Sequence, residues 1–196
     1  NIKKTNKIIF LNLQSLFKLL PSDDHIYFDI IKKINNCQFW FIEGLKKSIT
    51  TSFKNRIARF CRYHNLSFDK YFLFHPRMKT SDFFNLIKQS DVILDSLEWS
   101  GGKTSLDAIA LHKPIVTLPG ELMRGRYTYG ILKFLNLEQT IASSKKEYVE
   151  IAIKLATDKN FRNMISNKIK INKNRLYNDE TPIRFLEQFF KNEFKL

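Results

Sequence analysis

The sequence predicts an α/β protein built on a doubly wound parallel sheet. Short apolar runs, such as residues 92–94, are bounded by polar residues, as in strands that are buried on both faces. These runs alternate with longer segments whose apolar residues recur at helical spacing. Strands that alternate with helices imply right-handed crossovers, and therefore a parallel sheet with helices on both faces.

Length and composition fit one globular domain over residues 1–196, with 43% apolar residues to form a core. No apolar run approaches the roughly 20 residues that a membrane helix needs, and residues 1–7 lack the apolar region of a signal peptide. We therefore expect no membrane partner and a cytoplasmic location. The chain lacks an initial methionine and reaches its first strand within a few residues, which suggests a piece of a longer protein.

The chain is strongly basic, with a formal net charge of +14. Such an excess of positive charge is typical of proteins that bind nucleic acid. The lysines, however, are scattered over predicted helix faces and do not form a patch, so we do not expect nucleic acid to be the main partner. Cys37 and Cys61 are too few and too far apart for a disulfide framework or a metal cluster, and we expect both to be reduced.

The first half of the chain alternates strands with amphipathic helices. In the first predicted helix, for example, Ile26, Ile30 and Ile34 recur at helical spacing. Thr80 and Ser81 are typical helix-capping residues ahead of Phe83 and Ile87. The predicted elements are a strand over 8–13, a helix over about 23–34, a strand over 38–42, a helix over 51–64, a strand over 71–74 and a helix that Thr80 or Ser81 caps.

A glycine turn follows the fourth predicted strand, over 92–94. Gly101 and Gly102 precede a predicted helix that Thr104 or Ser105 could cap. The free N–H groups and the positive dipole end of such a helix form an anion site, and phosphate is its usual occupant. Asp107, one turn into the helix, could accept hydrogen bonds from ribose hydroxyls.

One other interpretation of this turn stays open, and another is excluded by the spacing of its residues. The two glycines could form only a turn, and Thr104 with Asp107 could be a capping box that meets no ligand. The sequence Gly102-Lys103-Thr104 is not a P-loop, because that motif requires glycine where position 97 is leucine.

The second half adds one strand and the closing C-terminal helices. The predicted elements are a strand over 114–118, a helix over about 126–135, a short apolar stretch over 140–142 that completes the sheet, and helices from 145 onward, including 183–190 after Pro182. In an open parallel sheet, ligands bind beyond the carboxyl ends of the strands. Lys18 and the segments 77–80, 99–104 and 119–126 should therefore surround one site.

Four motifs, in order and at matching spacing, resemble the Spindly-type O-linked N-acetylglucosamine transferase family. They are Gln-Ser-Leu-Phe-Lys at 14–18, Ser-Asp-Val-Ile-Leu-Asp at 90–95, Ser-Gly-Gly-Lys-Thr-Ser-Leu-Asp at 100–107 and Pro-Ile-Val-Thr-Leu-Pro-Gly-Glu at 114–121. The resemblance runs from about residue 8 to 155. It implies a Rossmann-like C-terminal domain of a GT-B glycosyltransferase, the half that binds the nucleotide-sugar donor.

The resemblance also implies roles for single residues. Lys18 matches the lysine that contacts the donor diphosphate and is the predicted catalytic residue. Phe83 could stack on uracil or belong to the core, and Lys18 could be a solvated lysine. The predicted donor-binding residues are Ser15, within the motif at 14–18; Met78 and Thr80, whose backbone reads the base edge; Phe83, against uracil; Gly102, Lys103, Thr104 and Ser105, around the diphosphate; Asp107, on the ribose; and Arg126, in the loop after Pro-Gly.

The function implied is inverting, UDP-sugar-dependent transfer of N-acetylglucosamine or a related sugar to Ser or Thr of an acceptor protein. We expect no metal or other cofactor, since Lys18 and the helix dipole would stabilise the leaving diphosphate. Animal relatives have Gly-His-Thr-Thr where this chain has 101–104, which leaves the donor sugar open. The N-terminal GT-B domain, an expected partner, and the tetratricopeptide repeats lie outside the sequence, so we expect no catalysis by this piece alone.

Two alternatives remain. The chain could belong to another GT-B transferase that uses a different nucleotide sugar, or it could be a non-catalytic, basic module that binds nucleic acid. A competition panel of nucleotides would separate the first alternative, and a salt titration the second.

Overall fold

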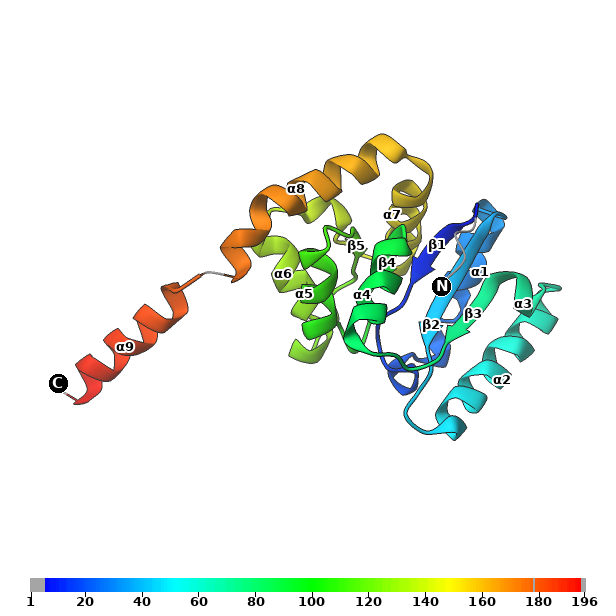
Figure 1. Cartoon of the computed structure of the whole chain (residues 1–196), viewed down its shortest axis with the longest axis horizontal. Helices are drawn as coiled ribbons and strands as arrows, with labels where there is room; N and C mark the ends of the chain where they lie inside the picture. The colour runs from blue at the N-terminus through cyan, green and yellow to red at the C-terminus, as the bar shows by residue number, and fades with distance from the viewer. Residues whose placement is uncertain (1–5, 178, 195–196) are drawn as a thin grey trace.

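The computed structural model describes residues 6–177 and 179–194. They form a five-stranded sheet in the order β3-β2-β1-β4-β5, and every strand pairing in it is parallel (Figure 1). The predicted fold class is confirmed. The strands are β1 (Ile8–Leu11), β2 (Cys37–Ile42), β3 (Phe72–His75), β4 (Val92–Leu94) and β5 (Ile115–Val116).

Most strand residues are buried because their side chains are apolar on both faces of the sheet. Phe10, Phe39 and Phe72 pair across three neighbouring strands, and their rings stack with centroid distances of 5.3 and 5.5 Å. Tyr27, on the first helix, meets Phe39 edge-on at 5.1 Å and covers this face. Aromatic pairs across strands stabilise a sheet beyond the area they bury, and here they also fix the register.

The α-helices cover both faces of the sheet. Because the crossovers are right-handed and their direction along the sheet reverses after β3, the helices before and after β3 lie on opposite faces. In Figure 1, α4 and α5 lie in front of the sheet, and α1 contacts α7 behind it. The helices are α1 (His25–Lys33), α2 (Lys47–Tyr63), α3 (Phe68–Tyr71), α4 (Thr80–Gln89), α5 (Lys103–Ala110), α6 (Tyr127–Phe134), α7 (Lys145–Thr157), α8 (Lys159–Tyr177) and α9 (Thr181–Phe194).

Short 3-10 helices lie in the connections. They are η1 (Leu16–Lys18), η2 (Pro21–Asp23), η3 (Met123–Gly125) and η4 (Glu138–Thr140). The predicted strand at 140–142 is reduced to a single parallel bridge between Thr117 and Ile141, because η4 takes up the chain as far as Thr140.

Two predicted helix starts in the first half of the chain, before β4, are wrong. Helix α4 already contains Thr80 and Ser81, and its N-cap is Lys79 in extended conformation, without a side-chain cap. Helix α2 begins at Lys47, ahead of the predicted 51, and Thr50 inside it accepts a hydrogen bond from the Gly44 N–H at 2.9 Å. Helix α3 was not predicted, because four residues are too few to show a periodic pattern.

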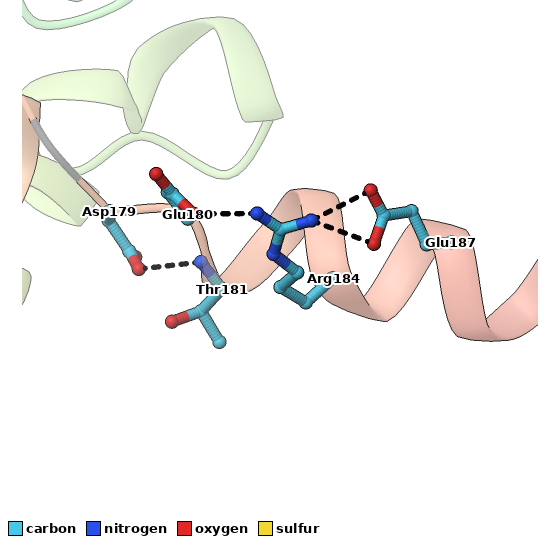
Figure 2. A network of polar contacts seen from close by, with 5 residues as sticks. All are labelled: Asp179, Glu180, Thr181, Arg184 and Glu187. Carbon is cyan, nitrogen blue, oxygen red and sulfur yellow. Dashed lines mark hydrogen bonds and ion pairs between the residues drawn. The ribbon is translucent and has the colours of Figure 1, made fainter.

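Helix α9 extends away from the rest of the molecule (Figure 1) and buries no residue. Arg184 lies between Glu180 and Glu187 one turn away on either side, with contacts of 2.8 to 3.0 Å (Figure 2). Another side of the helix exposes large apolar residues, which are Ile183, Phe185, Leu186, Phe189, Phe190 and Phe194. Over 6–177 and 179–194, no helix is both long and apolar enough to cross a membrane.

The strand order reverses between β1 and β4, since β2 and β3 lie on one side of β1 and β5 on the far side of β4. The loops after β1 and β4 therefore turn to opposite faces and leave a crevice between them at the carboxyl edge of the sheet. Such a crevice is the usual ligand site of a doubly wound fold.

Candidate functional site

A pocket of about 340 Å³ opens at the carboxyl edge of the sheet. Its walls are the loops that follow β1, β2 and β3, together with the start of α5. Six of the residues predicted to bind a donor line it: Ser15, Met78, Thr80, Phe83, Lys103 and Thr104. The volume falls within the usual range for small-molecule sites. Of the parts of the chain predicted to surround one site, segments 77–80 and 99–104 line this pocket, whereas Lys18 and segment 119–126 do not.

Asp95, the first residue after β4, organises the glycine turn beside this pocket. Its Oδ1 accepts a hydrogen bond from the Gly101 N–H at 2.8 Å, and its Oδ2 accepts from the hydroxyls of Ser100 and Thr117, each at 2.7 Å. Burial raises the pKa of this carboxyl above its usual value, and the three donors oppose the shift. In the sequence, Asp95 is marked only as the boundary of a strand and as the end of the motif at 90–95.

Glycine at position 101 leaves room for the side chains at the start of α5. A Cβ there would collide with Ser105 Oγ and would lie 2.9 Å from Thr104 Oγ1. The Gly101 carbonyl, in turn, accepts a hydrogen bond from the Thr128 hydroxyl at 3.0 Å, which ties the turn to α6. The backbone of the turn is therefore held at both its N–H and its C=O, so the start of α5 has a defined orientation.

Helix α5 begins one residue before the predicted caps. Gly102 is its N-cap, with φ −91° and ψ −92°, and no side chain caps it. The predicted caps Thr104 and Ser105 are wrong, and so is the capping box of Thr104 with Asp107. The first amides of a helix have no acceptor within the helix. Lys103 and Thr104 line the pocket, and their backbone N–H groups can therefore donate to an anion.

Ser105 faces the protein interior and not the pocket. Its hydroxyl is buried and lies 2.8 Å from Thr128 Oγ1, and its N–H donates to the Gly102 carbonyl at 3.1 Å. Both groups are thus used within the protein. Of the four predicted residues at the start of α5, Lys103 and Thr104 line the pocket, and Gly102 lies beside them in the chain.

Asp107 forms an ion pair with Lys103, one turn earlier on α5. The distance between Lys103 Nζ and Asp107 Oδ2 is 2.8 Å, and the Lys103 side chain is 80% exposed whereas that of Asp107 is 15% exposed. A pair so open to solvent on the lysine side contributes little to stability. Asp107 itself does not line the pocket and is joined to it through Lys103, which does.

Lys18 ends η1, in the loop after β1, and lies next to the main pocket. It lines a separate small cavity of about 30 Å³ with Asp95 and Tyr148 among its walls. Its Nζ lies 5.1 Å from the centroid of the Trp99 ring. Arg56 on α2 fixes the backbone here, since its Nη2 donates to the Leu19 carbonyl at 2.8 Å and its guanidinium pairs with Asp24.

Phe83 lines the pocket from the first turns of α4. It is half-buried, packs against the core, and lies 6.0 Å from the ring of Phe84. Phe84 also packs against the core but does not line the pocket. The core interpretation and the stacking interpretation of Phe83 are thus compatible: one side of the ring rests on the core while its pocket side can meet a ligand.

Of the two arginines near η3, Arg126 stabilises its own loop. Its Nη1 donates to the Gly120 carbonyl at 2.9 Å, and its guanidinium lies 4.7 Å from the Tyr129 ring. Arg124, which was not among the predicted binding residues, lies 4.8 Å from the centroid of Trp99. The missed signal was Trp99 itself, an exposed tryptophan in a loop that was already predicted to line the site.

The family model described as glycosyl transferase family 41 matches residues 3–181. A UDP-N-acetylglucosamine--peptide N-acetylglucosaminyltransferase of Caenorhabditis elegans is 24% identical over 151 residues, which are 77% of this chain and 13% of that protein. A probable SPINDLY transferase of Solanum lycopersicum is 34% identical over 68 residues, which are 35% of this chain and 7% of that protein. The chain thus spans a small part of these curated relatives.

Solved structures share the fold. A mutant of the Thermobaculum terrenum O-GlcNAc transferase superposes with a TM-score of 0.83 at 19% identity, and the match covers 96% of this chain and 36% of that one. The UDP-GlcNAc 2-epimerase of Neisseria meningitidis, solved with UDP-GlcNAc bound, superposes with a TM-score of 0.56 at 15% identity, over 91% of this chain and 46% of that one.

Proposed function

Because this chain belongs to glycosyl transferase family 41, we propose that its pocket binds the UDP part of a UDP-sugar donor. The observation that carries the proposal is the meeting of Ser15, Phe83 and Thr104, from three separate segments, in one pocket at the switch point of the sheet. The name of the Caenorhabditis elegans relative, which specifies UDP-N-acetylglucosamine, supports the same donor class.

In the binding mode that we propose, the uracil lies against Phe83 and its edge meets the backbone of Met78 to Thr80. The diphosphate lies over the amides of Lys103 and Thr104, where the helix dipole favours negative charge. Asp107 accepts hydrogen bonds from the ribose. Lys103 then exchanges its contact with Asp107 for one with phosphate, which frees the carboxylate for the sugar hydroxyls.

The reaction that we propose is O-linked, inverting transfer of N-acetylglucosamine or a related sugar to a protein Ser or Thr. The acceptor hydroxyl forms a bond to the sugar C1 while the bond from C1 to the diphosphate oxygen breaks, so that UDP leaves with the electron pair. Negative charge develops on the diphosphate. Lys18 and the first amides of α5 are placed to stabilise it, and such preorganised electrostatics is usually the largest catalytic term.

The acceptor side of the reaction needs more than these 196 residues, in our proposal. The chain spans 13% of the Caenorhabditis elegans relative and 36% of the Thermobaculum terrenum structure. We therefore propose that a second GT-B domain completes the acceptor site. We assign no general base to this chain and no metal to the reaction.

The experiment that tests this function is calorimetry of the chain with UDP, ADP and GDP. UDP should bind at least about tenfold more tightly, a difference of about 1.4 kcal/mol. Phe83→Ala should reduce this preference, whereas Phe84→Ala is the matched control, because that ring lies outside the pocket. Equal affinity for all three diphosphates would overturn the assignment of the base site.

The alternative functions make other predictions. A transferase with a different nucleotide sugar should prefer ADP or GDP in the same panel. A nucleic-acid-binding module should bind an oligonucleotide with an affinity that falls steeply with salt concentration.

A further inference from the structure

Two cations from different loops lie against one indole ring at the carboxyl edge of the sheet. Lys18 Nζ lies 5.1 Å and Arg124 Cζ 4.8 Å from the centroid of Trp99. Lys18 belongs to the loop after β1 and Arg124 to η3, after β5. Among the residues that the structure describes, neither side chain takes part in an ion pair.

The backbone fixes the place of Arg124 relative to Trp99. The Arg124 carbonyl accepts a hydrogen bond of 2.8 Å from the Ser100 N–H, next to Trp99 in the chain. The Trp99 carbonyl accepts from Gln14 Nε2 at 2.8 Å. Gly125 allows the loops to pack closely, because a Cβ there would lie 3.0 Å from the Leu97 carbonyl oxygen.

This arrangement has an electrostatic consequence. Two like charges that share one ring repel each other, and an exposed cation–π contact is worth only about 0.5–1 kcal/mol. An anion that carries two charges, bound beside Trp99, would offset the repulsion. A diphosphate has this charge, and the planar guanidinium of arginine binds phosphate through two parallel hydrogen bonds.

The strand order indicates which phosphate Arg124 would meet. The proposed base-reading loop follows β3, at one end of the sheet, whereas Arg124 follows β5 at the other end, with Lys18 and the start of α5 between them. A nucleotide bound along this edge therefore points its outer phosphate toward Arg124. We propose that Arg124 is a second diphosphate-binding residue, specific for the β-phosphate, and that Trp99 positions it together with Lys18. This inference rests on the proposed function.

The test is calorimetry of the 196-residue chain with UDP and with UMP, which lacks the β-phosphate. Arg124→Ala should weaken UDP binding about tenfold and UMP binding less than about twofold, as expected for the loss of one charge-assisted contact. Trp99→Ala should also weaken UDP more than UMP. Trp99→Phe, which keeps an aromatic face for the cations, should retain UDP affinity within about threefold.

Arg175→Ala is the matched control. Arg175 also lies over an exposed ring: its Cζ is 5.3 Å from the centroid of Phe134. Phe134 is the last residue of α6. This variant removes the same charge and should leave both affinities unchanged. Equal effects of Arg124→Ala and Arg175→Ala, or an equal loss of UDP and UMP binding in Arg124→Ala, would overturn the inference alone. A wild-type chain that does not bind UDP would overturn the proposed function as well.

Discussion

The Asp95 carboxylate lies 2.8 Å from the Gly101 N–H and joins the end of β4 to the glycine turn six residues later. The carboxyl is buried, and its other oxygen accepts from the Ser100 and Thr117 hydroxyls. Because these contacts orient the start of α5, the geometry of the proposed phosphate site depends on a residue that does not face the pocket.

Asp95 should make stability depend on pH. Burial raises its folded-state pKa above the unfolded value of about 3.8, so the folded protein holds this proton more tightly. The resulting stabilisation is fully present below pH 3.8 and is lost as the pH rises through the folded-state pKa. We expect the unfolding free energy of the wild type, relative to Asp95→Asn, to fall over this window. Denaturant titrations at several pH values measure it, and a difference that is constant or rises with pH would contradict the expectation.

Gly101→Ala should destabilise the protein by about 1–3 kcal/mol, because the added Cβ collides with Ser105 Oγ. It should also weaken UDP binding, since the turn must shift. Gly130→Ala is the control: Gly130 lies in α6 with no atom within 4 Å of the added Cβ, and the change should stabilise by about 0.5–1 kcal/mol. Chemical denaturation of both variants measures the effects. A Gly101→Ala protein as stable as wild type would show that the turn adapts.

Asp107→Asn should weaken UDP binding by about 1 kcal/mol or more, because the ribose loses charge-assisted hydrogen bonds. Stability should change by less than about 0.5 kcal/mol, since the ion pair with Lys103 is open to solvent. Thermal melting with and without UDP separates the two effects. A lower melting temperature with unchanged UDP affinity would assign Asp107 a structural role only.

Lys18→Ala should lower kcat by about 10²–10³ in a preparation with transferase activity, as expected when one preorganised charge-stabilising group is lost. The effect on KM should be smaller if the ammonium acts mainly on the charge that develops as UDP leaves. Lys18→Arg should retain little of the wild-type kcat, because the planar guanidinium of arginine differs in reach and shape from an ammonium group. Steady-state kinetics decides, and a raised KM with wild-type kcat would limit Lys18 to anchoring the donor.

Removal of residues 181–196 should change the unfolding free energy by less than about 0.5 kcal/mol, because α9 buries none of its residues. Shortening the chain instead before Ile165, which is fully buried on α8, should destabilise it strongly. Denaturant titration of the two truncated chains measures the contrast. A large loss from the first truncation would mean that α9 stabilises the domain.

The sequence alone determined the parallel sheet and the place of its site. Apolar runs such as 92–94 and helical spacing in segments such as 126–135 are local patterns, and strand-helix alternation implies the topology. From that topology it follows that segments 77–80 and 99–104 should meet, and Thr80 and Thr104 both line the pocket. A helix that buries one face needs apolar residues at helical spacing, so this part of the fold can be read from the sequence.

Only the tertiary structure decided which polar groups face the pocket. The starts of α4 and α5 depend on the backbone conformation of Lys79 and Gly102. Neither start has a side-chain cap that could be recognised in the sequence. Ser105 turned inward because Thr128, on a distant helix, offers its hydroxyl a partner. The choice between Arg124 and Arg126 depended on which guanidinium reaches Trp99 across two loops. Such contacts join residues far apart in the chain, so no local pattern records them.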